Sequence, residues 1–178
     1  MKYIALLRGI NVGGNKKIKM ADLRDLLTEN GFENVKTYIQ SGNVVFEHSA
    51  KAASELVDKM MNIITEKYGF EVKVVIKTVA EIETITNRIP KSILQDIPHN
   101  RVFAMLLDAI PEKESTNKLL EIDFSPDAIS IQNDVVYIVC PNGVSNSKLN
   151  NNFIEKQLKV SGTSRNYKTM AKLVEMTN

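Results

Sequence analysis

Residues 3–17 read Tyr-Ile-Ala-Leu-Leu-Arg-Gly-Ile-Asn-Val-Gly-Gly-Asn-Lys-Lys, and the first half of the chain is organised around them. Their first five residues form an apolar run of strand length. The next helical pattern begins near Met20, which leaves roughly eleven residues of connection where about 4–6 are usual. A connection this long behind a buried strand indicates a loop with a purpose.

This loop combines conformational freedom with positive charge. It contains three glycines and three basic residues: Gly9, Gly13, Gly14, Arg8, Lys16 and Lys17. Glycines open backbone conformations that other residues avoid and leave their N–H groups accessible, and the basic side chains supply charge around an anion. The loop therefore suits a phosphate or a carboxylate, while the alternative is a glycine-rich turn with solvated lysines.

The established glycine-loop motifs do not fit this stretch. Gly9 and Gly14 have the separation of the two glycines in GxxxxGK[ST], but Asn15 stands where that motif needs lysine and Lys16 where it needs serine or threonine. A GxGxxG motif is also missing, because no glycine lies two residues after Gly9. The loop is thus a candidate anion site without a recognised signature.

The order of predicted elements over residues 1–78 is β-α-β-β-α-β. After the first strand, we predict helices over 20–30 and 51–68 and strands over 35–40, 43–47 and 72–76. This order is typical of a ferredoxin-like unit, in which the end of strand one and the hairpin between strands two and three share one end of the sheet. The glycine loop and the turn Ser41-Gly42-Asn43 should therefore be neighbours, with these side chains converging: Arg8, Asn11, Gln40, Ser41 and Asn43.

Residues 101–158 repeat part of this order. We predict a strand over 101–107, a helix over 114–122, and strands over 128–132 and 135–139 joined by Asn133-Asp134. The hairpin letters resemble those of residues 38–46, which favours a duplication. The fold class is then α+β: a first ferredoxin-like repeat (1–78), a helical linker (79–100, with a helix over 79–88), a second, divergent repeat (101–158) and a C-terminal helix (159–178).

The second repeat is followed by two helical patterns. One covers residues 147–158, and the last opens at Thr163 with the residues Thr-Ser-Arg-Asn-Tyr-Lys-Thr. The opening places Arg165 and Lys168 near a helix N-terminus, where the helix dipole favours anions, although most openings of this kind are simple caps.

Composition narrows the classes of function. The chain has 178 residues, 43% of them hydrophobic and 25% charged, with a net charge of +2, one cysteine and two histidines. A single cysteine, Cys140, excludes an internal disulfide, and its place in an apolar run predicts a buried structural thiol; we expect no metal site and no cofactor. No apolar run approaches the ~20 residues of a membrane span, so we expect a cytoplasmic protein.

Three motifs together resemble one protein family. They are residues 7–14 (Leu-Arg-Gly-Ile-Asn-Val-Gly-Gly), residues 38–46 (Tyr-Ile-Gln-Ser-Gly-Asn-Val-Val-Phe) and residues 165–169 (Arg-Asn-Tyr-Lys-Thr). With these motifs the chain is similar, over essentially its whole length, to the bacterial family called domain of unknown function 1697 (DUF1697). The third motif departs from the family pattern, which usually has tryptophan where Tyr167 stands. The resemblance implies an α+β fold of two related halves and carries over no catalytic residues.

The sequence leaves four functions open. The first is binding of a phosphorylated or nucleotide-like small molecule through Arg8, Asn11, Gly13, Gly14, Lys16, Gln40, Ser41, Asn43, Arg165 and Lys168. The second is binding of RNA or single-stranded nucleic acid, suggested by the ferredoxin-like order but weakened by strands that are apolar at consecutive positions. An enzyme without a recognisable base beside a nucleophile, and a structural or oligomeric module without a ligand, are the others. The sequence does not determine the oligomeric state.

Overall fold

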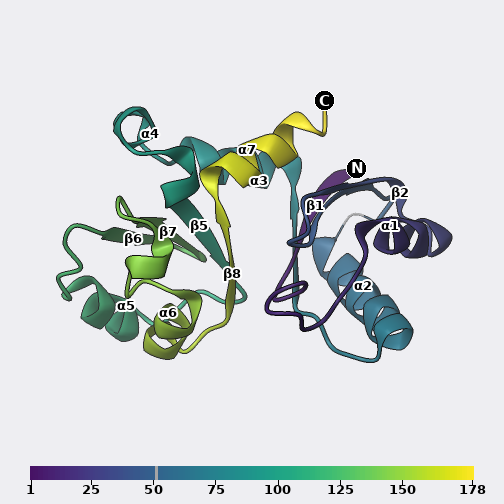
Figure 1. The fold of residues 1–178 in the computed structure, drawn as a ribbon, viewed down its shortest axis with the longest axis horizontal. Helices are drawn as coiled ribbons and strands as arrows, with labels where there is room; N and C mark the ends of the chain where they lie inside the picture. Colours follow the sequence, from purple (N-terminus) through teal and green to yellow (C-terminus); the bar gives the residue numbers. More distant parts are fainter. Residues whose placement is uncertain (51) are drawn as a thin grey trace. The chain divides into compact units, whose positions relative to one another are not determined.

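The computed structural model describes residues 1–50 and 52–178, and they divide into two compact units. The first unit comprises Met1–Glu83 together with Lys172–Asn178, and the second comprises Thr84–Ala171. Both are mixed α/β structures built around a four-stranded antiparallel sheet. Figure 1 shows the elements of each unit coloured along the chain.

The first unit has the element order β-α-β-β-α-β. Its elements are β1 (Lys2–Leu7), α1 (Met20–Glu29), β2 (Glu33–Tyr38), β3 (Asn43–Glu47), α2 (Ala53–Tyr68) and β4 (Val74–Thr78). The strand order is β2-β3-β1-β4, and every neighbouring pair is antiparallel. The predicted elements of this half are all present, although the helix expected over 51–68 begins at Ala53 and Lys51 lies outside the described residues.

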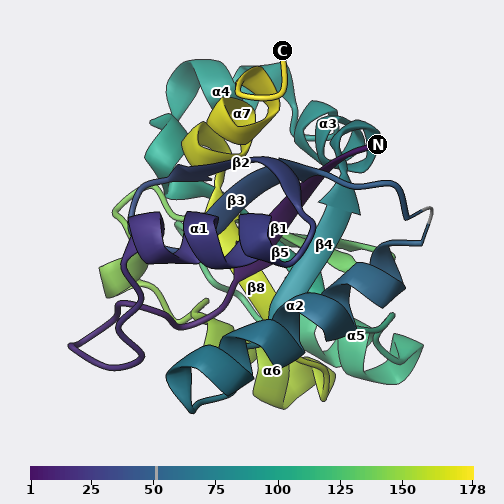
Figure 2. The same cartoon turned by 90° about the vertical axis from the view of Figure 1, so that its right-hand side faces the viewer.

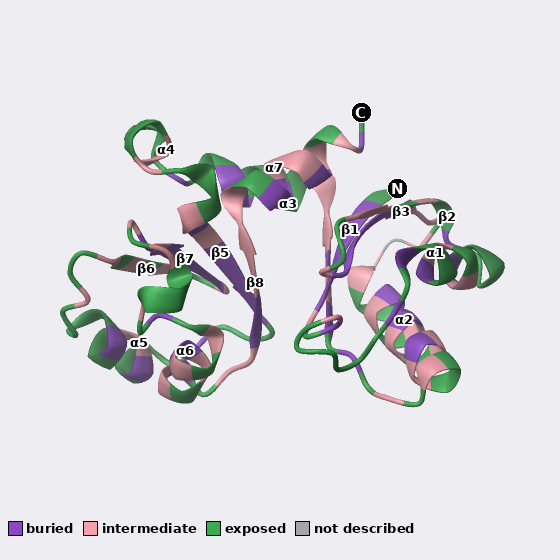
Figure 3. Ribbon diagram, viewed as in Figure 1, coloured by how far each residue is buried: buried purple, intermediate pink, exposed green. Residues whose placement is uncertain are grey.

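One face of the first sheet forms a core with α1 and α2, which lie across it in Figure 2. Alternate residues of β1 point into this core, as the two-residue period of a strand requires. They meet apolar residues at helical spacing from both helices; the buried cluster includes Tyr3, Ala5, Leu7, Leu23, Leu27, Leu56, Met60 and Ile64. Figure 3 shows the buried stripe along α2 facing the sheet and an exposed stripe facing away from it.

The second unit repeats this connectivity. Its elements include β5 (Val102–Leu107), α5 (Lys113–Leu120), β6 (Ala128–Gln132), β7 (Val135–Val139), α6 (Asn151–Leu158) and β8 (Gly162–Asn166). The strand order is β6-β7-β5-β8, again antiparallel throughout. The predicted hairpin at Asn133-Asp134 is confirmed, because β6 and β7 pair with Gln132 opposite Val135.

Shorter elements complete the chain. They are the helices α3 (Val79–Asn87) and α4 (Lys91–Asp96), the single-turn helices at His99–Arg101 and Val144–Asn146, and the last helix α7 (Tyr167–Glu175). The helix predicted over 79–88 is confirmed as α3, and the helix predicted over 147–158 begins later, at Asn151. The side chain of Asn150 caps that helix by accepting a hydrogen bond from the Phe153 amide at 3.0 Å.

The prediction that the last helix begins at Thr163 is wrong. Residues 162–166 form β8, the fourth strand of the second sheet, and α7 begins only at Tyr167. Thr163 pairs with Leu106 of β5 and is buried, so its backbone hydrogen bonds go to the sheet. The cap of α7 is Asn166, whose side-chain oxygen accepts from the Thr169 amide at 2.8 Å. The segment 159–178 is therefore a strand and a helix.

Candidate functional site

The connection between β1 and α1, residues 8–19, is a loop with two buried feet and an exposed tip. Ile10 and Ile18 are 1% and 2% exposed and belong to the core of the first unit. Val12, at the tip, is 65% exposed. The feet hold the loop on the core, and residues 11–17 project from it; we call residues 8–18 the glycine loop from here on.

The tip of the glycine loop is a tight two-residue turn. The Asn15 amide donates to the Val12 carbonyl at 3.0 Å, and the Asn11 amide donates to the Lys16 carbonyl at 3.2 Å. Gly13 and Gly14 occupy the centre with φ of 58° and 80°, the sign pattern of a type I′ turn. A Cβ added at either glycine would meet no heavy atom within 4 Å, so both sit in open space.

Asn11 closes the base of this turn with its side chain. Its Nδ2 donates to the carbonyl oxygens of Ile18 at 2.9 Å and Gln40 at 2.8 Å, and its Oδ1 accepts from the Ile18 amide at 2.9 Å. The amide group thus ties the two feet of the loop together and joins them to the β2–β3 turn. Asn11, predicted as a ligand-binding residue, has a structural role in this geometry.

The β2–β3 turn lies beside the glycine loop, as the strand order requires. The Leu7 amide donates to the Gly42 carbonyl at 2.7 Å. Gly42 has φ of 75°, and a Cβ there would stand 2.6 Å from Leu7 Cβ and 2.8 Å from Ile10 Cδ1. Only glycine therefore fits at this contact between turn and loop.

The polar residues of the turn differ in their availability. Asn43 is fully buried and its Nδ2 donates to the Tyr38 carbonyl at 3.0 Å and to Ser41 Oγ at 2.9 Å. Gln40 is exposed, and its carbonyl accepts the bond from Asn11. Asn43 and Ser41 thus hold the turn in shape, and among the predicted residues of the turn Gln40 is the exposed one.

The three basic residues of the loop differ in their burial and contacts. Lys16 Nζ donates to the Glu71 carbonyl at 2.6 Å and lies 6.0 Å from the Phe70 ring centroid, so it links the loop to the segment before β4. Arg8 is half-buried, and its backbone amide donates to the Lys73 carbonyl at 2.9 Å. Lys17 is exposed. Of the three basic residues, Lys16 is thus engaged by the segment before β4, whereas the side chain of Lys17 makes no hydrogen bond or ion pair with the described residues.

Arg165 and Lys168 belong to the second unit. Arg165 lies on β8 opposite Ala104, its Nη1 donates to the Ser164 carbonyl at 2.8 Å, and burial lowers its pKa to about 10, which keeps it charged at neutral pH. Lys168 is exposed in the first turn of α7. Both residues therefore belong to a different unit from the glycine loop.

Other reactive residues are used structurally. His48 Nδ1 accepts from the Ala50 amide at 2.9 Å. Cys140 is fully buried, as predicted, and burial raises the pKa of its thiol. Across residues 1–50 and 52–178 there is no group of three or more histidine, cysteine, aspartate or glutamate side chains placed to hold a metal ion, and no helix long and apolar enough to cross a membrane.

Sequence reasoning missed a second polar feature, a cavity in the second unit that Arg88 and Tyr137 line. The two residues lie far apart in the sequence, and Tyr137 stands inside an apolar strand, where a tyrosine is usually read as core. Only the fold brings them to one cavity.

The comparisons with known proteins concern family and fold. A solved structure, that of the conserved bacterial protein SP0830 from Streptococcus pneumoniae, is similar with a TM-score of 0.78 and 23% sequence identity, covering 99% of this chain and 98% of that one. At this identity the similarity shows a common fold. No curated protein matches the sequence. The model of the family described as a protein of unknown function (DUF1697) matches residues 1–137, and the chain therefore belongs to the DUF1697 family.

Proposed function

We propose that the first unit binds a phosphate-bearing small molecule, of the size of a nucleotide or a phosphorylated metabolite, at the glycine loop. The observation that carries the proposal is the open turn at Gly13-Gly14, closed at its base by hydrogen bonds of Asn11, in a loop that also contains Arg8 and Lys17. This arrangement combines preformed backbone donors with nearby cations.

The backbone of the tip has the character of an anion site. Successive residues in turn conformation direct their N–H groups to one side and form a concavity that favours anions. Gly13 and Gly14 carry no side chain to shield those groups, and the space beside each is empty of described atoms. A phosphate oxygen is a strong acceptor for such donors, and Arg8 and Lys17 add charge-assisted contacts.

The revised set of binding residues is smaller than the predicted one. It retains Arg8, Gly13, Gly14 and Gln40 and adds Lys17. Asn11, Asn43 and Ser41 support the loop and turn, and Lys16 anchors the loop to Glu71. The proposal is limited to binding, because these groups include no nucleophile beside a base.

A small molecule is favoured over nucleic acid because of the sheet. Residues 3–7 of β1 are all 0–1% exposed, so both faces of the central strand are buried. Proteins that bind single-stranded RNA on a sheet of this order use an open face on which bases stack. A cytoplasmic location, where nucleotides and phosphorylated metabolites are abundant, is part of this proposal.

We also infer that the units are two ferredoxin-like repeats that arose by duplication. The support is the equal strand order, β2-β3-β1-β4 and β6-β7-β5-β8, with antiparallel pairing throughout. The element order β-α-β-β-α-β of each unit is that of the split βαβ arrangement.

The experiment is calorimetric titration of the full chain with inorganic pyrophosphate and with adenosine diphosphate. Replacing Arg8 by Ala removes a charge-assisted contact worth roughly 1.5–3 kcal/mol, and affinity should fall about ten- to a hundredfold. Lys148→Ala removes an equal charge from an exposed position in the second unit and serves as the control. Equal affinity of wild type and Arg8→Ala, with both folded by circular dichroism, would contradict the proposal.

A further inference from the structure

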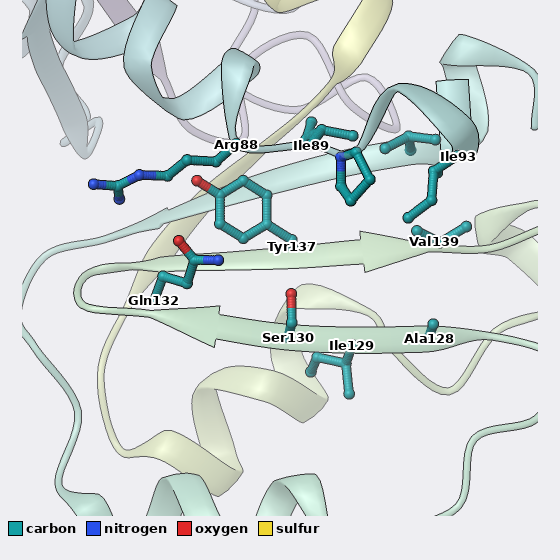
Figure 4. A pocket seen from close by; sticks show the side chains of 11 residues that line it. Arg88, Ile89, Ile93, Ala128, Ile129, Ser130, Gln132, Tyr137 and Val139 are labelled. Atoms are coloured by element: carbon teal, nitrogen blue, oxygen red, sulfur yellow. The ribbon is translucent and has the colours of Figure 1, made fainter. Parts of the chain in front are cut away.

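The second unit contains a cavity of about 250 Å³ between one face of its sheet and the segment that joins α3 to α4. It is lined by Arg88, Ile89, Pro90, Ile93, Val102, Ala128, Ile129, Ser130, Gln132, Tyr137 and Val139. Figure 4 shows the Tyr137 ring standing between β7 and the segment above it. All lining residues belong to the second unit, so the cavity exists independently of the glycine loop.

The two ends of this cavity differ in polarity. Figure 4 places the Tyr137 hydroxyl, Gln132 and Arg88 toward one end, while Ile93 and Val139 lie at the other. A cavity with convergent polar groups at one end of an apolar wall fits an amphipathic molecule, whose polar head and apolar body are held by different parts of the site.

The buried hydroxyl of Tyr137 is the group in this cavity that lacks a hydrogen-bond acceptor within residues 1–50 and 52–178. Tyr137 is 7% exposed, and its buried hydroxyl donates to no acceptor among the residues that the structure describes. Buried hydroxyl groups normally have a partner, because an unpaired one costs roughly 1–3 kcal/mol. An acceptor supplied by a bound molecule would satisfy it.

The electrostatics of this end define the acceptor. Burial raises the pKa of Tyr137, while the Arg88 guanidinium, which can donate to the phenol oxygen, opposes that rise through this hydrogen bond and its charge, and the Asp134 carboxylate adds to the rise. The phenol is therefore protonated at neutral pH and acts as a donor. Arg88 is exposed and supplies a cation beside that donor. A donor and a single cation together suit one carboxylate.

We propose that this cavity binds a small monocarboxylate with an apolar body, its carboxylate between the Tyr137 hydroxyl and Arg88 and its body along Ile93 and Val139. The volume corresponds to about eight water-sized groups, at roughly 30 Å³ each. The ligand class is thus a short fatty or aryl carboxylate. A phosphate dianion suits the site less well, because Arg88 is the one cationic residue of the lining and Asp134 lies near the same end.

The test is titration of the full ¹⁵N-labelled chain with hexanoate, followed by NMR. Hexan-1-ol and hexylammonium, which have a similar apolar chain and a different polar head, are the comparison ligands. Hexanoate should shift the amides of the lining residues and bind at least about tenfold more tightly than either probe. Equal binding of hexan-1-ol would overturn the carboxylate assignment, and unshifted lining amides would overturn the site itself.

Two variants of lining residues and two control variants complete this test. Tyr137→Phe removes only the hydroxyl, so the thermal midpoint should stay equal or rise while hexanoate affinity falls about tenfold or more. Arg88→Gln should lower the affinity similarly, and Tyr167→Phe, a tyrosine outside the lining, should leave it unchanged. Wild-type affinity in Tyr137→Phe would refute the role of the hydroxyl. Arg8→Ala should have no effect on hexanoate, which separates this proposal from the first.

Discussion

Three backbone hydrogen bonds recur at equivalent places in the two units, yet the residues at those places differ except for Leu7 and Leu107. The amides of Leu7 and Leu107 donate to the carbonyls of Gly42 and Asp134, at 2.7 and 2.8 Å. The amides of the next residues, Arg8 and Asp108, donate to the carbonyls of Lys73 and Ser161, both at 2.9 Å. Each acceptor directly precedes the fourth strand of its unit. The amides of His48 and Cys140, which directly follow the third strand of each unit, donate to the carbonyls of Met1 and Arg101 at 3.0 and 2.9 Å. Each acceptor directly precedes the first strand of its unit.

The connection that follows these bonds differs most. In the first unit it spans residues 8–19, with the glycine turn and its basic neighbours, whereas in the second it spans residues 108–112. At the first position of each, arginine is replaced by aspartate, and Asp108 Oδ1 accepts from the Ser161 amide at 3.0 Å. The shorter connection closes the same topology. The exposed tip of the longer connection, residues 12–17, is therefore not needed to close this topology, whereas Ile10 and Ile18 belong to the core. This supports the binding role proposed for the tip.

The comparison predicts its largest effect at Gly42, which has a residue with a Cβ, Asp134, as its counterpart. Gly42→Ala should destabilise the chain by about 2–5 kcal/mol, from a left-handed backbone of roughly 1–2 kcal/mol and overpacking of roughly 1–3 kcal/mol against Leu7 and Ile10. Urea unfolding measures this free energy.

Gly13→Ala is the matched control for Gly42. It shares the positive φ but meets no atom within 4 Å, so it should cost only about 1–2 kcal/mol. If the two substitutions cost the same, then close packing between the turn and the loop does not distinguish these glycines, and the loop is not anchored as described.

The second effect concerns Asn11, which has no counterpart in the short connection. Asn11→Ala removes three hydrogen bonds and leaves the Ile18 backbone groups without their partner, which should cost about 1–3 kcal/mol. Hydrogen exchange of the Ile18 amide should accelerate. Asn15→Ala, at the exposed tip, should change neither quantity. Unchanged exchange at Ile18 in Asn11→Ala would show that the side chain does not hold the loop.

Smaller effects are expected at the two residues that follow the third strand of each unit, Cys140 and His48. The first concerns the reactivity of the Cys140 thiol. Burial raises the pKa of its thiol, with Asp127 adding to the rise and Ser147 opposing it, so little reactive thiolate forms. At pH 8 a thiol reagent should label the native chain more than about tenfold slower than the chain unfolded in urea. Fast stoichiometric labelling without denaturant would contradict the burial of this residue.

His48, the counterpart of Cys140, gives the smallest effect. Burial, followed by the charge of Lys59, lowers its pKa below 6.5, so the unfolded chain binds the proton more tightly. The stability that neutral His48 contributes is then present above pH 6.5 and is lost as the pH falls toward the lower pKa of the folded state.

Urea unfolding at pH 7.5 and pH 5.5 measures this dependence. His48→Gln should reduce the loss of stability between these values, and His99→Gln, at an exposed histidine, is the control. A pH dependence that is the same in wild type and His48→Gln would mean that another group is responsible.

The limits of sequence reasoning are visible at particular residues. The strands β6 and β7 were predicted at their observed bounds, because their apolar runs and turn are local signals. The strand β8 was missed, since Gly-Thr-Ser-Arg-Asn resembles a helix cap and becomes a strand only by pairing with β5. In the candidate site, the strand order was enough to predict that the glycine loop and the β2–β3 turn are neighbours. The Asn11 side chain, however, is engaged in hydrogen bonds with Ile18 and Gln40, and no sequence pattern encodes these contacts.

The most direct test of the central claim is an NMR titration of the ¹⁵N-labelled wild-type chain with inorganic pyrophosphate. We expect saturable shifts of the amides of residues 8–17, Gly13 and Gly14 among them, with smaller shifts at the adjoining turn, residues 40–42. The same titration of Arg8→Ala should need about ten- to a hundredfold more ligand. Glycine-loop amides that do not move while pyrophosphate reaches saturating excess, or shifts confined to the second unit, would contradict the claim that this loop is an anion-binding site.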